Sequence, residues 1–287
     1  MAQLSFTTDA YRSNPPLNLY PAKDEEAGVI LFGTPGLKTW VDTALPYEVR
    51  GMLVAGDFLY AVVRDSVLKI GPDGAFSVIG TVNKVSGLVS MTYNEFQLLI
   101  IDNPYAYIFT FSTNVFSQVT DTDFPGASSA AFMDGFFCFT EPNSGKWWIT
   151  AIYDGYDIDA LDYVSTEGHP DHNVRIIADH RELWVFGDKS VEQYYNSGDS
   201  TFPFAKNTSG FIESGCGAWG SVVQVDNSIY WLTEKGFVVR AEGYRPMIVS
   251  TQKVSDDIQS WNSFSDAIAY AWTWRNHTFY VLTSPSA

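Results

Sequence analysis

A short apolar strand that follows a tight turn recurs six times along the chain. The copies span 57–63, 95–101, 135–139, 181–186, 227–232 and 276–282, and each is dominated by aliphatic and aromatic residues. The intervals are 38, 40, 46, 46 and 49 residues between the anchor positions Tyr60, Leu98, Cys138, Trp184, Tyr230 and Phe279. A period of about 40 to 50 residues built from short strands is typical of β-propeller blades.

The first two repeats each divide into four short strands. β-Branched and aromatic runs alternate there with turns rich in Gly, Pro, Asp and Asn, which is the signature of strands joined by tight turns. The expected strands are 51–55, 58–63, 67–70 and 75–82 in the first repeat, and 89–93, 96–101, 106–111 and 115–119 in the second. The continuous apolar run 98–101 indicates an inner strand buried on both faces, because each blade packs between two neighbours.

The fold predicted from these patterns is all-β, a β-propeller of about six four-stranded blades with an extended N-terminal arm. The expected division is an arm over residues 1–36 and a propeller over residues 37–287. We expect a single short helix over 254–261, where Ser255-Asp256-Asp257 resembles a helix start.

The sixth repeat ends at Ala287, and an unclosed propeller would leave strand edges exposed. Two explanations remain open. Residues 29–43 could supply a closing strand, or the natural chain continues beyond this sequence and the propeller is incomplete at its C-terminus. We expect the second.

Composition narrows the class of protein. The 287 residues include 17 Lys and Arg against 33 Asp and Glu, which gives a formal net charge of −16. With 46% hydrophobic and 16% aromatic residues the chain is predicted to be folded rather than disordered. The acidic balance disfavours nonspecific wrapping of nucleic acid, which needs clustered Lys and Arg.

We expect the protein to be made in a reducing compartment and not to be inserted in a membrane. Residues 1–6 show no basic region followed by an apolar stretch, so no signal peptide is expected, and no run approaches 18 apolar residues. The two cysteines, Cys138 and Cys216, are expected to be buried thiols rather than a disulfide.

Common catalytic motifs are absent, and two weak metal-like patterns occur. His169-Pro170-Asp171-His172 would place two imidazoles and a carboxylate close together, and residues 154–162 hold four aspartates. We interpret the first as a solvated loop and the second as a solvated acidic turn. No catalytic residue, cofactor or metal is therefore expected.

Aromatic pairs raise the alternative of a propeller glycosidase or lyase acting on host-surface polysaccharide. Trp147-Trp148, Trp272-Thr273-Trp274 and Tyr194-Tyr195 could stack sugars, and paired carboxylates would be needed for hydrolysis. Adjacent residues on a strand point to opposite faces, so one of each adjacent pair is expected in the core. A third reading is an intracellular propeller that binds protein partners.

Several segments resemble the packaged-DNA stabilisation proteins of short-tailed bacteriophages, also called tail hub or nozzle proteins. The resemblance covers about residues 14–250 and is strongest in the middle of the chain. It is carried by Asn18-Leu19-Tyr20-Pro21, Gly33-Thr34-Pro35-Gly36-Leu37, Glu167-Gly168-His169-Pro170-Asp171, Leu183-Trp184-Val185-Phe186-Gly187, Ser190-Val191-Glu192-Gln193-Tyr194-Tyr195 and Phe211-Ile212-Glu213-Ser214-Gly215-Cys216.

The resemblance implies a structural virion protein without enzymatic activity. It implies a homohexameric ring below the portal and its adaptor that continues the DNA channel and helps retain packaged DNA until ejection. The implied partners are the head-to-tail adaptor and distal tail proteins, with passive contact to genomic DNA and no membrane insertion. The implied location is the virion tail, assembled in the bacterial host cytoplasm. The arm over 1–36 would contact a neighbour or the adaptor, and acidic loops such as 153–162 would face the channel.

Overall fold

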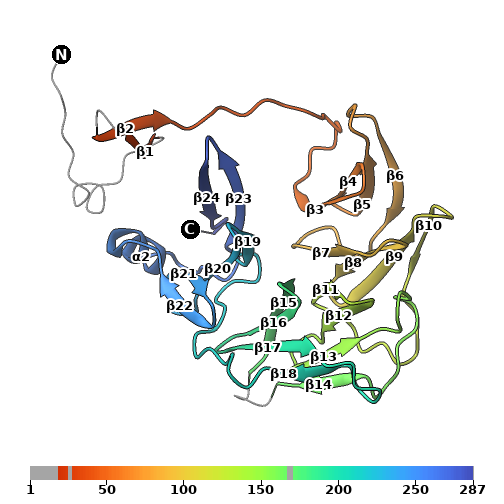
Figure 1. Ribbon diagram of the computed structural model, residues 1–287. Coiled ribbons are helices and arrows are strands. Elements are labelled where there is room, and N and C mark those ends of the chain that lie inside the picture. Colours follow the sequence, from red (N-terminus) through yellow and green to blue (C-terminus); the bar gives the residue numbers. More distant parts are fainter. Residues whose placement is uncertain (1–18, 25–27, 167–170, 287) are drawn as a thin grey trace.

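Five four-stranded antiparallel sheets and one two-stranded hairpin follow one another around a common axis (Figure 1). The computed structural model describes residues 19–24, 28–166 and 171–286. The β-propeller predicted from the repeat period is confirmed, with the sixth sheet reduced to two strands within the described residues.

The blades are consecutive in the chain, and each runs from its first strand to its fourth. Blade 1 holds β3 (Val49–Ala55), β4 (Phe58–Val63), β5 (Ser66–Ile70) and β6 (Phe76–Thr81). Blade 2 holds β7 (Ser90–Tyr93), β8 (Gln97–Asp102), β9 (Tyr105–Thr110) and β10 (Val115–Gln118). Blade 3 holds β11 (Ser129–Met133), β12 (Phe136–Thr140), β13 (Lys146–Ile149) and β14 (Tyr163–Ser165). Blade 4 holds β15 (Asn173–Asp179), β16 (Glu182–Gly187), β17 (Val191–Asn196) and β18 (Phe204–Lys206). Blade 5 holds β19 (Val223–Val225), β20 (Ser228–Leu232), β21 (Val238–Glu242) and β22 (Arg245–Ile248).

The first strand of each blade lies nearest the axis and the later strands lie progressively outward (Figure 1). All eight strands expected in the first two blades are present, and none of their ends is shifted by more than two residues. The apolar run 98–101 lies on β8, the second strand, rather than on the innermost one. Every residue of β8 is buried because sheet neighbours flank it on both sides and adjacent blades cover both faces.

The core consists of apolar layers between neighbouring blades. Tyr60 and Val62 of blade 1 pack against Leu98 and Phe109 of blade 2, and similar clusters join each later pair of sheets. Alternate residues of a strand serve opposite layers, so one strand contributes to two clusters. The core is therefore distributed around the ring rather than gathered at one centre.

This layering corrects the expectation for one aromatic pair. Trp147 and Trp148 of β13 are 0% and 7% exposed, so both belong to the core. They point to opposite faces, as predicted, but blades on either side cover both faces. For the pair Tyr194 and Tyr195 the prediction is confirmed, since Tyr194 is buried and Tyr195 is exposed.

The sixth sheet consists of β23 (Ile268–Trp274) and β24 (His277–Thr283), preceded by helix α2 (Gln252–Gln259). The helix was expected over 254–261, and it begins two residues earlier. Its N-cap is Thr251, whose hydroxyl accepts a hydrogen bond from the Val254 N–H. Ser255, expected at the helix start, is instead buried inside the helix, where its hydroxyl bonds that of Ser250 at 2.8 Å.

A separate hairpin precedes the propeller. It comprises β1 (Leu19–Asp24) and β2 (Gly28–Gly33), which among the described strands pair only with each other. The alternative in which residues 29–43 close the propeller is therefore wrong, because the first part of that segment pairs with its neighbour in sequence, the shorter loop to close. The division between arm and propeller at residue 36 stays a prediction.

Candidate functional site

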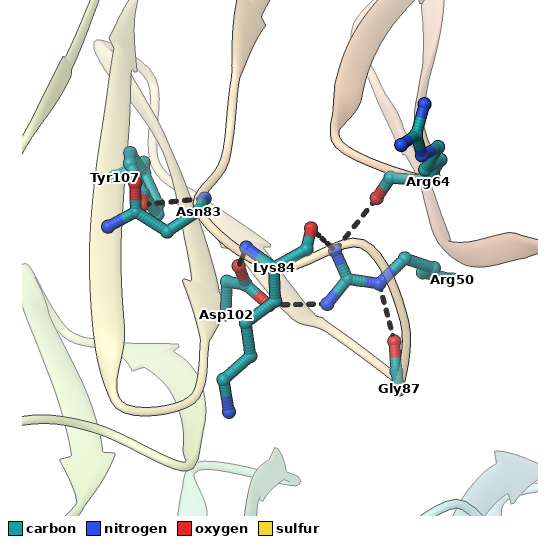
Figure 2. A network of polar contacts seen from close by, with 7 residues as sticks. All are labelled: Arg50, Arg64, Asn83, Lys84, Gly87, Asp102 and Tyr107. Carbon is teal, nitrogen blue, oxygen red and sulfur yellow. Dashed lines mark hydrogen bonds and ion pairs between the residues drawn. The ribbon is translucent and has the colours of Figure 1, made fainter.

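A buried ion pair joins the first two blades near the axis (Figure 2). The Arg50 guanidinium lies on β3 and contacts the Asp102 carboxylate at the end of β8, and both side chains are 1% exposed. Arg50 also donates to three backbone carbonyls, from Nε to Gly87 at 2.6 Å and from Nη1 to Lys84 at 2.7 Å and Arg64 at 2.8 Å. The guanidinium therefore has both a counter-charge and carbonyl partners, as a buried cation requires.

The same network holds the connection between blades 1 and 2. The second Asp102 oxygen accepts from the Lys84 N–H at 2.8 Å, and the Tyr107 hydroxyl accepts from the Asn83 N–H at 3.0 Å (Figure 2). Burial raises the pKa of Tyr107, so the phenol stays protonated. The contacts fix backbone rather than leave groups free for a reaction. The sequence analysis missed this site, although a lone arginine at the start of an apolar strand was a usable signal.

The middle segment that resembles phage tail proteins forms a second polar cluster. Asp171 is buried, and its Oδ2 accepts from both the N–H and the hydroxyl of Ser190 at 2.8 Å. Its Oδ1 accepts from the Lys189 N–H at 3.0 Å. A Cβ at Gly187 would collide with that carboxylate, so only glycine fits beside it. Asp171 therefore fixes the β16–β17 turn.

Glu192 in the next strand forms a separate set of buried contacts. Its Oε1 accepts from the Lys206 ammonium and its Oε2 from the Tyr194 hydroxyl, both at 2.6 Å, and its side chain is 2% exposed. The pair ties β17 to β18. The motif residues named here thus build a scaffold, because they fix a turn and tie two strands.

The acidic turn over 154–162 is largely solvated, as expected, whereas the expectation of a solvated loop is wrong for Asp171, which is buried because its carboxylate caps the β16–β17 turn. Asp154, Asp157 and Asp159 are exposed, and Asp154 and Asp159 accept hydrogen bonds from backbone two residues ahead. Asp171 serves the turn described above, His172 is exposed, and His169 lies outside the described residues. Over 19–24, 28–166 and 171–286, no group of three or more His, Cys, Asp and Glu side chains could hold a metal ion.

The cysteines behave as expected. Cys138 and Cys216 are both free and buried. Burial raises the pKa of Cys138 well above its usual value and that of Cys216 to about 11, so both thiols stay protonated near neutral pH.

A polar pocket of about 270 Å³ lies between blades 4 and 5. The His180 ring bonds Asp179 Oδ2 and Asn227 Oδ1, both at 2.8 Å, and these hydrogen bonds, that to Asp179 first, raise the pKa of His180. Glu182 Oε1 accepts from the Tyr244 hydroxyl at 2.6 Å. The Asp179 and Glu182 carboxylates of this pocket are thus engaged in hydrogen bonds. The His180–Asn227 and Glu182–Tyr244 bonds tie blade 4 to blade 5. The strand register that brings these side chains together could not be predicted from the sequence.

The sixth sheet is the most exposed part of the propeller. Within the part of the chain that the structure describes, β24 pairs only with β23. Tyr270 and Trp274 on β23 are 56% and 41% exposed. A largely apolar cavity of about 470 Å³ separates β24 from blade 5 and α2. Unpaired strand edges and exposed aromatic side chains are typical of surfaces that meet another chain.

The N-terminal hairpin covers part of this region. The ring of Tyr20 lies 5.0 Å from that of Phe279 and 5.1 Å from that of His277, measured between centroids. The Arg275 guanidinium lies 5.7 Å from the centre of the Phe32 ring. These contacts are made by side chains alone, so the hairpin attaches to the sixth sheet without extending it.

One further finding concerns membranes: within the described residues, the chain contains no helix long and apolar enough to cross a bilayer.

Solved structures support the fold. The extracellular domain of a putative hybrid two-component system, BT4673 from B. thetaiotaomicron, matches with a TM-score of 0.52 and 13% identity over 79% of this chain and 29% of that chain. YCF48 bound to a D1 peptide matches with a TM-score of 0.51 and 11% identity over 84% of this chain and 76% of that chain. This chain therefore spans less than a third of the first structure's length. At such identities the likeness shows the fold alone.

Sequence comparison identifies the family. No curated protein matches the chain. A family model described as "Bacteriophage P22 Gp10, beta-propeller" matches residues 4–287, which is nearly the whole sequence. The family consists of phage stabilisation proteins and is not an enzyme family. With its ring of β-sheets and this match, the chain belongs to the P22 Gp10-like phage stabilisation family.

Proposed function

We propose that this protein is a structural component of a phage tail. It forms a homohexameric ring below the portal and adaptor, continues the DNA channel and helps retain packaged DNA until ejection. The observation that carries the proposal is the family match over residues 4–287. The proposal includes no enzymatic turnover, and its partners are the adaptor and the distal tail proteins.

The polar clusters support a scaffold role. The Arg50–Asp102 pair joins two blades, Asp171 fixes a turn, and Glu192 ties two strands. Each group fixes geometry within the chain. A tail component that must stay assembled against the pressure of packaged DNA benefits from such internal cross-links within and between blades.

The exposed sixth sheet and its surroundings are the proposed contact surface between copies. Met247 and Ile248 on β22 are 47% and 60% exposed, and Tyr270 and Trp274 on β23 are also exposed. A ring needs a head-to-tail contact in which one surface of each copy meets a different surface of the next. The unpaired edge of β24 would then be covered by the neighbouring copy.

The arm over residues 1–36 is proposed to contact a neighbour or the adaptor. The described part of the arm docks through the Tyr20 contacts, and the chain that follows it carries exposed Leu37 and Trp40. Exposed large apolar side chains on an extended segment favour a protein partner.

The acidic loop over 153–162 is proposed to face the channel. Asp154, Asp157 and Asp159 are exposed between β13 and β14, and the whole chain has a net charge of −16. Negative charge on a channel wall repels DNA phosphates and lets the duplex slide without adhering.

Quantitative mass spectrometry of purified virions tests the tail role. We expect about six copies per particle, counted against the portal. Absence from particles would refute the tail role, and a copy number incompatible with six would refute the hexamer.

A deletion tests the arm. We expect a chain lacking residues 1–33 to keep the β-rich circular dichroism spectrum of the full chain and to be incorporated poorly into particles. The matched control is Arg181→Met, a single change at a side chain that is 84% exposed and distant in sequence from the arm. Incorporation of the deletion variant at the control level would contradict the assembly role of the arm.

A further inference from the structure

An axial cavity of about 460 Å³ lies among the first strands of the blades. Its walls come from β3, β7, β15 and β23 and from the segment around Trp219. Two arginines, Arg50 and Arg175, line it, and none of its described lining residues is an aspartate or glutamate. In a chain with 33 acidic and 17 basic residues, a cavity lined by arginines and by no carboxylate is the opposite of what the overall composition predicts.

The two arginines differ in their partners. Arg50 is neutralised by Asp102, as Figure 2 shows. Arg175 has no ion pair to any described residue. Its Nη1 donates to the Trp219 carbonyl at 3.1 Å, and its guanidinium carbon lies 4.3 Å from the centre of the Trp219 ring. Its buried Nε has no hydrogen-bond partner within the described chain.

The charge on Arg175 is therefore only partly compensated. Desolvation by burial lowers the pKa of Arg175 to about 10, and the group remains cationic at neutral pH. The titratable group that acts on it is the Cys216 thiol, whose own pKa is raised to about 11, so it supplies no negative charge there. The Arg175 residue is half-buried, and a cation partly removed from water without a counter-charge is destabilised, so a bound anion would reduce that cost.

The cavity is large enough for an anion, and Trp219 holds the Arg175 guanidinium in an orientation that suits one. The cavity volume is more than ten times the volume of about 30 Å³ that one water molecule occupies in the liquid. Stacking on Trp219 holds the guanidinium plane in place, and a planar fork suits two oxygens of a carboxylate or phosphate. Glu48 and Asp266 line a neighbouring cavity that shares Trp219 and Gly220. That cavity is also lined by Lys84 and by the Arg50–Asp102 pair, so its net charge is negative and favours an anion at Arg175 instead.

We propose that Arg175, held against Trp219, binds a small oxyanion of the carboxylate or phosphate class in the axial cavity. The site is independent of the tail role, because it depends on the geometry of a single chain. Two sources share this chemistry: a free phosphate-type ion, and a carboxylate such as one offered by a neighbouring protein.

Isothermal titration calorimetry of the full chain tests the site, with inorganic phosphate and acetate as separate probes at constant ionic strength. We expect saturable binding with one ion per chain. Arg175→Gln should weaken it by about tenfold or more, since a charge-assisted hydrogen bond contributes at least that factor. Binding of phosphate but not acetate indicates a phosphate-type ligand, and comparable binding of acetate indicates a carboxylate.

The matched control is Arg245→Gln, which removes the same charge from an exposed position and should leave the affinity unchanged. Should Arg175→Gln fail to fold by circular dichroism, Arg175→Lys keeps the charge but loses the planar fork, and we expect a several-fold loss with it. Two results would overturn the site: no saturable binding of either probe, or an affinity unaltered by the Arg175 variant that folds.

Discussion

Replacing Arg50 with methionine probes the contact that joins the first two blades. Methionine keeps much of the side-chain length and removes the guanidinium. The substitution leaves the Asp102 carboxylate buried without its counter-charge, with the Lys84 N–H as a remaining donor. It also removes the side-chain donor to three backbone carbonyls. Breaking a buried pair by removing one partner costs about 3 to 5 kcal/mol, since the other charge stays buried.

Thermal unfolding followed by circular dichroism measures this loss. For a chain of this size, about 1 kcal/mol shifts the unfolding midpoint by roughly 2 °C or more. We therefore expect Arg50→Met to lower the midpoint by about 6 to 10 °C. Arg181→Met is the matched control, because Arg181 forms an ion pair with Asp134 at 3.5 Å while 84% exposed. Exposed pairs contribute about 0 to 1 kcal/mol, so the control should unfold close to the unmodified chain.

A midpoint for Arg50→Met within about 2 °C of the Arg181→Met midpoint would refute the reasoning. A double variant sharpens the test. Replacing Asp102 with leucine in the Arg50→Met background removes the stranded charge, so we expect part of the lost stability to return. If the double variant is less stable than either single variant, the two groups do not act as a buried pair.

Three further predictions follow from single contacts. Trp184→Ala empties a core position that is 5% exposed. We therefore expect a loss of about 3 to 5 kcal/mol in the free energy of unfolding, measured with a denaturant, and an unchanged unfolding midpoint would place Trp184 outside the core. Gly187→Ala places a methyl group against the Asp171 carboxylate. We therefore expect the free energy of unfolding to fall by about 1 to 3 kcal/mol in the same assay, and a stability equal to that of the unmodified chain would show that the turn adjusts to the methyl group without cost. The His180 imidazole bonds Asp179, which raises its pKa; the stabilisation is complete below the unfolded pKa near 6.5 and is lost as pH rises through the folded pKa. An NMR titration should therefore show a midpoint above 6.5, and a midpoint at or below it would contradict the bond to Asp179.

The candidate sites show where sequence reasoning was limited. The apolar strand over 181–186 was predicted from local residue types, and the motif residues Gly187, Ser190 and Glu192 were noted for their resemblance to a family. Their partners were not predicted, because Asp171 and Lys206 approach them only through the fold. The Arg50–Asp102 pair was missed entirely, since its members lie 52 residues apart and nothing local marks them as partners.

The repeat, the strands of the first two blades and one strand of each later blade could be predicted from the sequence. Alternation of apolar residues and the placement of Gly, Pro, Asp and Asn in turns act over a few residues. The strands of each blade are therefore specified by that blade's own segment of the sequence. Those local signals are strong enough to predict β4, which spans the predicted 58–63, and β8, which lies one residue from its predicted 96–101.

How the sheets meet became visible only in the folded chain. The fold buried both Trp147 and Trp148, because neighbouring blades cover both faces of β13. It paired β2 with β1 instead of adding it to the sixth sheet, leaving β24 with one paired edge among the described strands. It also left Arg175 in the axial cavity without a carboxylate. These outcomes depend on side chains that meet across the ring from distant parts of the chain, and no local pattern records which distant residues will become neighbours.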